Sequence, residues 1–317
     1  MPVTLVIHGG AGNIHPGMMT GSQEEQYREG LAAALDKGYA VLRDGGAATD
    51  AVIAAITELE NNVLFNAGRG SVFTKKGLHE MDAALMDGAT LSAGAIAGVR
   101  NIKNPIQLAR EVMLHSGHVF LSGKGAGEFA LSRGIEFAPD DYFFNKDRYD
   151  QWVDIRDSDF YQLDHKEDNL KGPIPNTDHK FGTVGAVACD AQGNLAAGTS
   201  TGGMTNKRFG RIGDSPVIGA GTYANNKTCA ISCTGHGEYF LRAVVAYDVS
   251  CLMEYKGLSL QEACNMVVKD KLVKLGGEGG LIAVDALGNH DFCFNSAGMY
   301  RAMRNDAGRE EVAFYGV

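Results

Sequence analysis

Thr183 is the residue whose surroundings most clearly indicate chemistry. It follows Gly182, after a polar, turn-rich stretch over 164–180, and it begins a strand-like apolar run over 183–189. This layout suits a chain that is cut between Gly182 and Thr183. A threonine at a new N-terminus brings its own base, because an α-amino group with a pKa of about 7.7–8.0 can take the proton of the hydroxyl. The alternative is an ordinary β-branched strand residue.

Three other residues offer hydroxyl or amide groups for the same reaction. Thr201 lies in a Thr-, Ser- and Gly-rich run, where a second hydroxyl can orient Thr183 and hold its proton. The alternative is a loop threonine bonded to its own backbone. Thr234 and Gly235 end a predicted strand before a helix, so a hydroxyl and a glycine N–H can form an oxyanion hole there. A helix N-cap is the alternative for Thr234, and it is compatible with that role.

Arg211 and Asp214 are opposite charges three residues apart in a glycine-framed loop. A guanidinium binds a carboxylate through two hydrogen bonds, and a carboxylate binds an ammonium, so the pair can hold both α-groups of an amino-acid-like substrate. The alternative for Arg211 and Asp214 is a surface ion pair, which contributes little to stability. Gly237 is expected to line the same site. Asn66 is expected to donate its side-chain amide during cleavage, or else is a turn asparagine.

The composition argues against several classes of function. The chain has 317 residues, 44% of them hydrophobic, a net charge of −9 and no Lys/Arg-rich cluster, so nucleic acid is not an expected partner. No apolar run approaches the ~18 residues that span a bilayer, and the N-terminus is typical of a buried strand rather than a signal peptide. Six scattered cysteines indicate buried thiols in a reducing, cytoplasmic compartment. The nine histidines form no HxxxH or HxH pair and no nucleotide-binding glycine motif occurs, so neither a catalytic transition metal nor an organic cofactor is expected.

Hydrophobic periodicity and turn residues predict the elements that position these groups. Strands are expected over 3–7, 183–189, 195–199, 228–233, 280–284 and 290–294, and helices over 23–43, 49–59, 105–115, 123–132, 237–255 and 259–275. Thr49 is expected to cap the second helix, Pro105 to open the third, and Ser259 with Glu262 to form a capping box. Two alike D-A-x-G-N turns, at 190–194 and 285–289, each join a hairpin, the second being the last.

This order places strands and helix pairs in two halves, with hairpins instead of regular βαβ alternation. It favours a layered α+β domain with mostly antiparallel sheets. The two halves are expected to meet near residues 160–182.

A series of short motifs occurs in order along nearly the whole chain. They are residues 8–12 (HGGAG), 65–68 (FNAG), 81–83 (MDA), 94–99 (GAIAGV), 104–105 (NP), 182–185 (GTVG), 199–203 (TSTGG), 210–216 (GRIGDSP), 221–224 (GTYA) and 233–237 (CTGHG). Together they resemble the plant-type asparaginase/isoaspartyl (β-aspartyl) peptidase family of N-terminal-nucleophile hydrolases. The resemblance implies a four-layer αββα sandwich and self-cleavage between Gly182 and Thr183.

The same resemblance implies the products of that cleavage and the roles of the site residues. The α subunit would be residues 1–182, with a flexible linker over 160–182, and the β subunit residues 183–317, with two αβ units associated as (αβ)2. The catalytic residues implied are Thr183, Thr201, Thr234 and Gly235, the substrate-binding residues are Arg211, Asp214, Gly235 and Gly237, and Gly182, Thr183 and Asn66 serve self-cleavage.

The segment 59–69 resembles the loop that binds a structural sodium ion in this family through backbone carbonyls. The carbonyls implied are those of Leu59, Glu60, Asn62, Phe65, Ala67 and Arg69. Since carbonyls would bind the ion, side-chain variation at Asn62 and Arg69 matters little. The alternative is a plain helix-to-strand loop.

The implied activity is hydrolysis of L-asparagine and β-aspartyl dipeptides, with L-aspartate released through an acyl-enzyme on Thr183. A glycosylasparaginase-like enzyme is one rival, against which stand Gly182 in place of an aspartate and the lack of a signal peptide or disulfide pattern. A threonine-aspartase-like endopeptidase is a second, against which stands a clamp for free α-groups. An unprocessed, inactive binding protein is a third, although Thr183, Thr201 and Arg211 are all present.

Overall fold

The computed structural model describes residues 2–157 and 182–316. Its first part contains β1 (Thr4–Gly12), α1 (Gly21–Arg43), α2 (Ala48–Asn61), a 3₁₀ turn η1 (Gly68–Gly70), β2 (Met81–Asp87), β3 (Ala93–Val99), α3 (Pro105–His115), β4 (Phe120–Ser122), α4 (Gly123–Ser132), α5 (Asp140–Phe143) and α6 (Lys146–Ile155). The second part contains β5 (Val184–Cys189), β6 (Leu195–Thr201), β7 (Thr222–Ala224), β8 (Cys229–Gly235), α7 (Gly237–Ala243), α8 (Val245–Lys256), α9 (Leu260–Asn265), a π-helical continuation η2 (Met266–Leu272), β9 (Gly279–Asp285), β10 (His290–Phe294), β11 (Gly298–Asn305) and β12 (Glu310–Tyr315).

The strands form two sheets. The larger has eight strands in the order β12-β11-β1-β5-β6-β2-β3-β4, and the smaller has four in the order β10-β9-β8-β7. Neighbouring strands are antiparallel except β3 and β4, which are parallel. Strands β5 and β6 therefore lie between β1 and β2, so the two halves of the sequence share one sheet.

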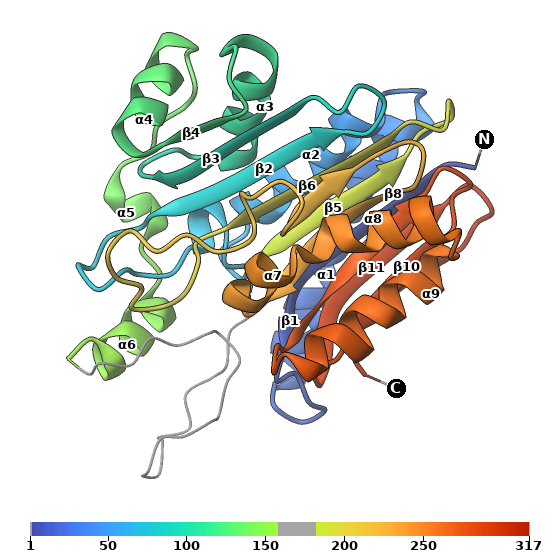
Figure 1. Ribbon diagram of the computed structural model, residues 1–317. Coiled ribbons are helices and arrows are strands. Elements are labelled where there is room, and N and C mark those ends of the chain that lie inside the picture. Colours follow the sequence, from blue (N-terminus) through green and yellow to red (C-terminus); the bar gives the residue numbers. More distant parts are fainter. Residues whose placement is uncertain (1, 158–181, 317) are drawn as a thin grey trace.

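Helices cover the outer faces of both sheets, which gives the αββα sandwich expected from the sequence (Figure 1). Strand β1 illustrates the layering, because its side chains alternate between two cores. Leu5 and Ile7 pack into the core under α1 and α2, whereas Val6 packs into the core between the two sheets. A third core, which includes Ile231 and Phe240, lies between the smaller sheet and α7–α9.

The N-terminus of α2 departs from the expectation. The helix begins at Ala48 with Ala47 as its N-cap, and Thr49 lies inside it, so the predicted Thr49 cap is wrong. The Ala48 N–H instead donates to Asp190 Oδ2, 3.2 Å away in the turn between β5 and β6. A carboxylate remote in sequence thus occupies the positive end of the helix dipole, where a local cap is usual.

The single helix predicted over 237–255 is two helices. Val244 separates α7 from α8 with φ 52°, in the left-handed region. This conformation is unfavourable for a β-branched residue. The break is stabilised from outside, because the N–H groups of Ala246 and Tyr247 donate to the carbonyls of Ala220 and Gly219.

The two D-A-x-G-N turns are alike, as predicted. Asp190 Oδ1 accepts hydrogen bonds from the N–H groups of Gln192 and Asn194, and Asp285 Oδ1 accepts the matching pair from Leu287 and Asn289. The second hairpin is not the last, however, because β11 and β12 follow it. Pro105 opens α3 and Ser259 forms its capping box with Glu262, both as predicted.

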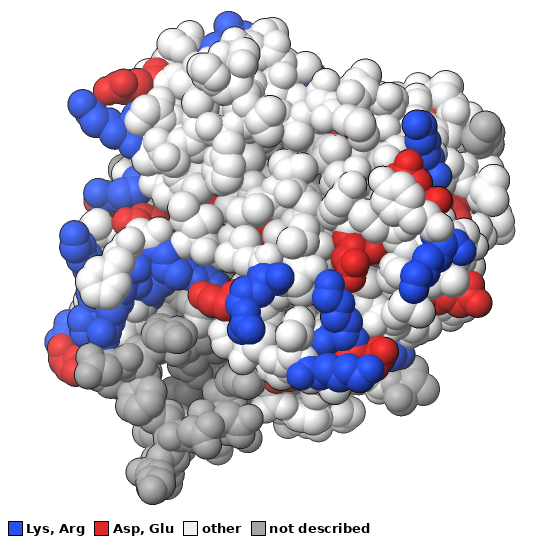
Figure 2. Space-filling model, viewed as in Figure 1, with Lys and Arg blue, Asp and Glu red and all other residues white. Residues whose placement is uncertain are grey.

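Two further expectations concern the surface and the cysteines. Among residues 2–157 and 182–316, no helix is both long and apolar enough to cross a membrane. Acidic and basic side chains are interspersed on the face shown in Figure 2. All six cysteines are free thiols, and all are buried except Cys251, which is half-buried.

Candidate active site

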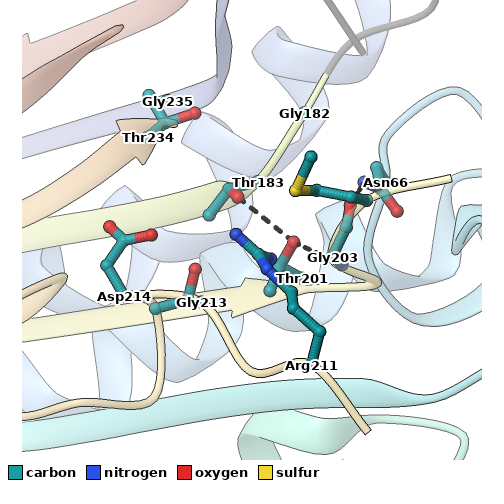
Figure 3. A pocket seen from close by; sticks show the side chains of 12 residues that line it. Asn66, Gly182, Thr183, Thr201, Gly203, Arg211, Gly213, Asp214, Thr234 and Gly235 are labelled. Carbon is teal, nitrogen blue, oxygen red and sulfur yellow. Dashed lines mark hydrogen bonds between the residues drawn. The ribbon is translucent and has the colours of Figure 1, made fainter. Parts of the chain in front are cut away.

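Thr183 directly precedes β5, and it lines a pocket (Figure 3). Thr183 Oγ1 donates a hydrogen bond to Thr201 Oγ1, 3.1 Å away at the end of β6. Because β5 and β6 are antiparallel partners, the start of one strand lies beside the end of the other. The hairpin predicted from the sequence therefore brings the two hydroxyls together.

Thr201 is itself held by the backbone that follows it. The Gly203 N–H donates to Thr201 Oγ1 at 3.0 Å, so Thr201 makes both of the contacts considered for it, one with Thr183 and one with the nearby backbone. Asn66 Nδ2 donates to the Gly203 carbonyl at 2.7 Å, and Asn66 Oδ1 accepts the Val72 N–H. Asn66 lines the pocket as expected, with one amide N–H engaged by Gly203, and it positions the segment that holds Thr201.

Thr234 and Gly235 end β8 on another side of the pocket. Thr234 Oγ1 accepts the N–H of Ala11 at 3.3 Å, which leaves the hydroxyl proton free to point at a substrate oxygen. A side chain at Gly235 would meet the Glu278 carbonyl at 2.5 Å, so only glycine fits. The N-cap of α7 is His236, so the alternative role of Thr234 as that cap is wrong.

Arg211 and Asp214 lie in the loop between β6 and β7, and neither is a surface group. The Arg211 side chain is 19% exposed, and its ion-pair partner is Glu238, not Asp214. Nε and Nη2 donate to the two Glu238 carboxylate oxygens, each at 2.9 Å. A Cβ on Gly237 would lie 2.8 Å from Arg211 Nη2 and 2.9 Å from Asp214 Oδ1, so glycine makes room for both groups. The alternative, a surface ion pair between Arg211 and Asp214, is therefore wrong.

Asp214 is buried beside the pocket, and its Oδ2 has no hydrogen-bond partner. Burial raises the pKa of Asp214 to about 7, although the positive charge of Arg211 opposes the shift. Burying an unpaired carboxylate is costly unless a cation compensates it. This group is therefore suited to bind a ligand ammonium.

His8 lies in β1, opposite Gly185 of β5. Its Nε2 lies 2.8 Å from Ser232 Oγ, which in turn lies 2.7 Å from Thr199 Oγ1. Burial lowers the pKa of His8 to about 3, against the effect of the Thr183 backbone, so the imidazole is neutral. A Cβ on Gly185 would collide with both Ser232 Oγ and His8 Nε2. The imidazole of His8 therefore has a structural hydrogen-bonding role.

The segment 59–69 folds back on the end of α2. A Cβ on Gly68 would lie 2.5 Å from the Glu60 carbonyl oxygen, and one on Gly70 would contact that of Phe65. The Phe65 and Ala67 carbonyls each accept one backbone N–H, which leaves each a second lone pair. An all-oxygen donor set fits a hard cation. The described residues contain no group of three His, Cys, Asp or Glu side chains that could hold a metal ion.

The predicted catalytic residues converge on one pocket. It is lined by Asn66, Gly182, Thr183, Thr201, Gly203, Met204, Arg211, Gly213, Asp214, Ser215, Thr234 and Gly235. Gly237, which was expected to line the site, is not among these residues, but it packs against Arg211 and Asp214. Sequence reasoning missed four of these lining residues, Gly203, Met204, Gly213 and Ser215. It also missed Glu238, the partner of Arg211, although Glu238 directly follows the predicted Gly237. Apart from Gly182, the predicted linker over 160–182 lies outside the described residues.

This αββα sandwich, with a threonine hydroxyl before a central strand and a pocket built around it, is the architecture of the N-terminal-nucleophile hydrolases. Comparison with known proteins shows to which family within this class the chain belongs. Residues 1–314 match the asparaginase family Asparaginase_2, and the chain belongs to that family.

Several relatives are similar over most of their length. The isoaspartyl peptidase of Escherichia coli is 52% identical over 298 residues, which cover 94% of this chain and 91% of that protein. The isoaspartyl peptidase of Salmonella typhimurium is 51% identical and 94% of each chain is covered. The isoaspartyl peptidase/L-asparaginase of Rattus norvegicus is 43% identical, with 96% of this chain and 86% of that protein covered.

Proposed function

We propose that the protein is an isoaspartyl peptidase/L-asparaginase that hydrolyses β-aspartyl dipeptides and L-asparagine, with Thr183 as nucleophile. The observation that carries the proposal is the Thr183–Thr201 hydroxyl pair at 3.1 Å in a pocket that also holds Arg211 and Asp214. The family and the names of the relatives support the substrate class.

The reaction begins once Thr183 is an N-terminus. Its hydroxyl oxygen attacks the substrate carbonyl carbon, and its own α-amine takes the hydroxyl proton. In the uncut chain the Thr183 hydroxyl donates to Thr201 Oγ1. Once the α-amine is free, the Thr183 hydroxyl proton turns to the amine, and the Thr201 hydroxyl donates to Thr183 Oγ1 and fixes the position of the attacking oxygen. The oxygen of the tetrahedral intermediate receives hydrogen bonds from the Thr234 hydroxyl and the Gly235 N–H.

Collapse of the intermediate breaks the amide C–N bond. Ammonia, or the amine of the second residue, leaves with the proton held by the Thr183 amine, and an ester forms between Thr183 and the aspartyl group. Water then attacks the ester and gives a proton to the amine, and the amine passes this proton to the Thr183 oxygen as L-aspartate leaves.

The same hydroxyl serves self-cleavage in the uncut chain. Thr183 attacks the Gly182 carbonyl, the acyl group moves from nitrogen to oxygen, and water hydrolyses the resulting ester. The products are an α subunit of residues 1–182 and a β subunit of residues 183–317, assembled as (αβ)2.

The clamp selects substrates with free α-groups. Arg211 binds the α-carboxylate and the unpaired Asp214 carboxylate binds the α-ammonium, and both groups are free in asparagine and in a β-aspartyl dipeptide. An aspartate inside a protein chain lacks them, which disfavours an endopeptidase.

A structural sodium ion in the segment 59–69 is part of the proposal. The carbonyls of Leu59, Glu60, Asn62, Phe65, Ala67 and Arg69 would hold it, and it would fix the loop that carries Asn66 without taking part in bond breaking. Exchange of sodium for choline at constant ionic strength should lower the melting temperature; an unchanged value would contradict the site.

Intact mass and a denaturing gel after incubation test the main proposal. We expect two fragments, one beginning at Thr183, and release of aspartate from asparagine and β-aspartyl dipeptides. A chain that stays whole at 33.7 kDa and releases no aspartate would overturn it and leave an inactive binding protein. Aspartate released from glycosylated asparagine alone would identify the glycosylasparaginase-like rival.

A further inference from the structure

The Arg211 guanidinium offers two edges that can each bind a carboxylate. Glu238 occupies the edge made by Nε and Nη2, with both hydrogen bonds at 2.9 Å. The other edge, made by Nη1 and the second N–H of Nη2, has no hydrogen-bond partner among the described residues, and Arg211 lines the pocket. Two glycines leave room for the guanidinium itself. A Cβ on Gly213 would lie 2.8 Å from Nη1, and a Cβ on Gly237 would lie 2.8 Å from Nη2.

We propose that Glu238 is a positioning residue that holds the Arg211 guanidinium by one edge and presents its other edge to the α-carboxylate of the substrate. The inference rests on the proposed function and adds to it a residue that determines specificity. Glu238 itself does not touch the substrate.

The geometry explains why such a partner is needed. An arginine side chain has many rotamers, and ordering it costs free energy at the moment of binding unless it is ordered beforehand. Two charge-assisted hydrogen bonds in one plane fix both the position and the plane of the guanidinium. Since Glu238 uses the Nε edge, substrate binding need not break this ion pair.

The surroundings of Glu238 place it on the outer side of the pocket. Its side chain is 42% exposed, whereas that of Arg211 is 19% exposed. His236 Nε2 lies 3.3 Å from Glu238 Oε2, so the carboxylate is flanked by the clamp on one side and an imidazole on the other. Glu238 is the second residue of α7, directly after Gly237, and this short helix fixes its backbone.

Glu238→Gln tests the proposal, because glutamine keeps the size and loses the charge. We expect KM for asparagine to rise about tenfold, with kcat changed less than about twofold, since uniform binding of the carboxylate is weakened. Self-cleavage, which involves no free α-carboxylate, should proceed as in the wild type. Asp248→Asn is the matched control, because Asp248 in α8 pairs with Lys271 at 2.9 Å and the change removes its charge. This variant should leave KM unchanged.

Two further readouts separate positioning from general loss of structure. For 3-aminopropanamide, which is asparagine without its α-carboxylate, Glu238→Gln should not change kcat/KM. In an Arg211→Met background, Glu238→Gln should have no further effect on asparagine, since the two residues act as one unit.

An unchanged or lower KM for asparagine would overturn the proposal, the second outcome indicating that Glu238 competes with the substrate for Arg211. An equal loss with 3-aminopropanamide would also overturn it. Failure of the proposed function itself is distinguishable, because the wild-type protein would then show no aspartate release.

Discussion

Thr183 Oγ1 and Thr201 Oγ1 lie 3.1 Å apart at the junction of two paired strands. Thr201→Val keeps the shape of the side chain and removes this hydrogen bond. We expect kcat for asparagine to fall by about 10²-fold, because the nucleophile loses its orienting partner. Thr201→Ser should retain most of the activity, as measured by ammonia release from protein that has already been cleaved.

Thr228→Val is the control for this prediction. Its hydroxyl makes a buried hydrogen bond of 2.7 Å to Ser250, away from the pocket. The change should cost about 1 kcal/mol of stability without altering kcat. An equal fall in kcat for Thr201→Val and Thr228→Val would assign the effect to the fold and not to Thr183.

Gly237→Ala should damage substrate binding through Arg211 and Asp214. The added methyl group would lie 2.8 Å from one and 2.9 Å from the other, which is too close for either to stay in place. We expect kcat/KM for asparagine to fall at least about tenfold. Gly125→Ala, in open space on α4, should leave kcat/KM unchanged and stabilise the protein by up to about 1 kcal/mol. Normal kinetics in Gly237→Ala would contradict the clamp.

The ionisation of Asp214 predicts a pH dependence that differs between two substrates. Burial raises its pKa to about 7, and only the ionised form attracts the substrate ammonium. The kcat/KM for asparagine should therefore fall as the pH is lowered through about 7. Succinamate, which is asparagine without the α-amino group, does not need this charge. We expect the kcat/KM for asparagine, divided by the kcat/KM for succinamate, to fall towards acid pH by up to about tenfold per pH unit. A constant ratio from pH 5 to 8 would be evidence against Asp214 as the ammonium site.

The raised pKa of Asp214 affects the free energy of unfolding in the opposite direction. A folded-state pKa above the usual value of 3.8 means that folding favours the protonated Asp214. Its contribution to stability is full below that value and is lost as the pH rises through about 7. L-Aspartate, whose ammonium pairs with the ionised form, should therefore raise the melting temperature more at pH 8 than at pH 5.

Asp190 and Asp285 provide a matched pair for stability. Both organise the same turn, but Asp190 also accepts the Ala48 N–H at the start of α2. Asp190→Ala should therefore lower the free energy of unfolding by about 1 kcal/mol more than Asp285→Ala, the usual value of a helix cap. Denaturant titration of both variants measures the difference; equal losses would mean that the contact with α2 contributes nothing.

Local patterns predicted the longer helices and strands β1, β5, β6, β8, β9 and β10, because hydrophobic spacing, capping residues and D-A-x-G-N turns act within a few residues of each other. Strands β2, β3, β4, β7, β11 and β12 and the helices α5 and α6 were not predicted. Strand β11 was missed because it contains charged residues. Arg301 is only 7% exposed, and its guanidinium lies over the rings of Phe292 and Phe294. Partners distant in the sequence make that arginine compatible with the core, and no local pattern reveals them.

The candidate site likewise contains residues that local motifs identify and residues that only the fold brings together. Short motifs identified Thr183, Thr201 and the Arg211–Asp214 loop, because these groups occur in distinctive local sequences. The partner of Arg211 could not be identified in this way. Glu238 lies 27 positions further on, and only the folded chain brings the two side chains together. The break at Val244 likewise depends on carbonyls of a separate loop.

The position of β5 has a consequence for the cut protein. This strand is hydrogen-bonded to β1 on one side and to β6 on the other, and β1 is also bonded to β11. Cleavage before Thr183 would therefore yield two polypeptides whose strands alternate within one sheet. Neither would be a domain by itself, and pulling them apart would expose long unpaired strand edges. Dilution should not dissociate such a pair below its unfolding transition, and an active protein should be recoverable when the two pieces, made separately, are refolded together.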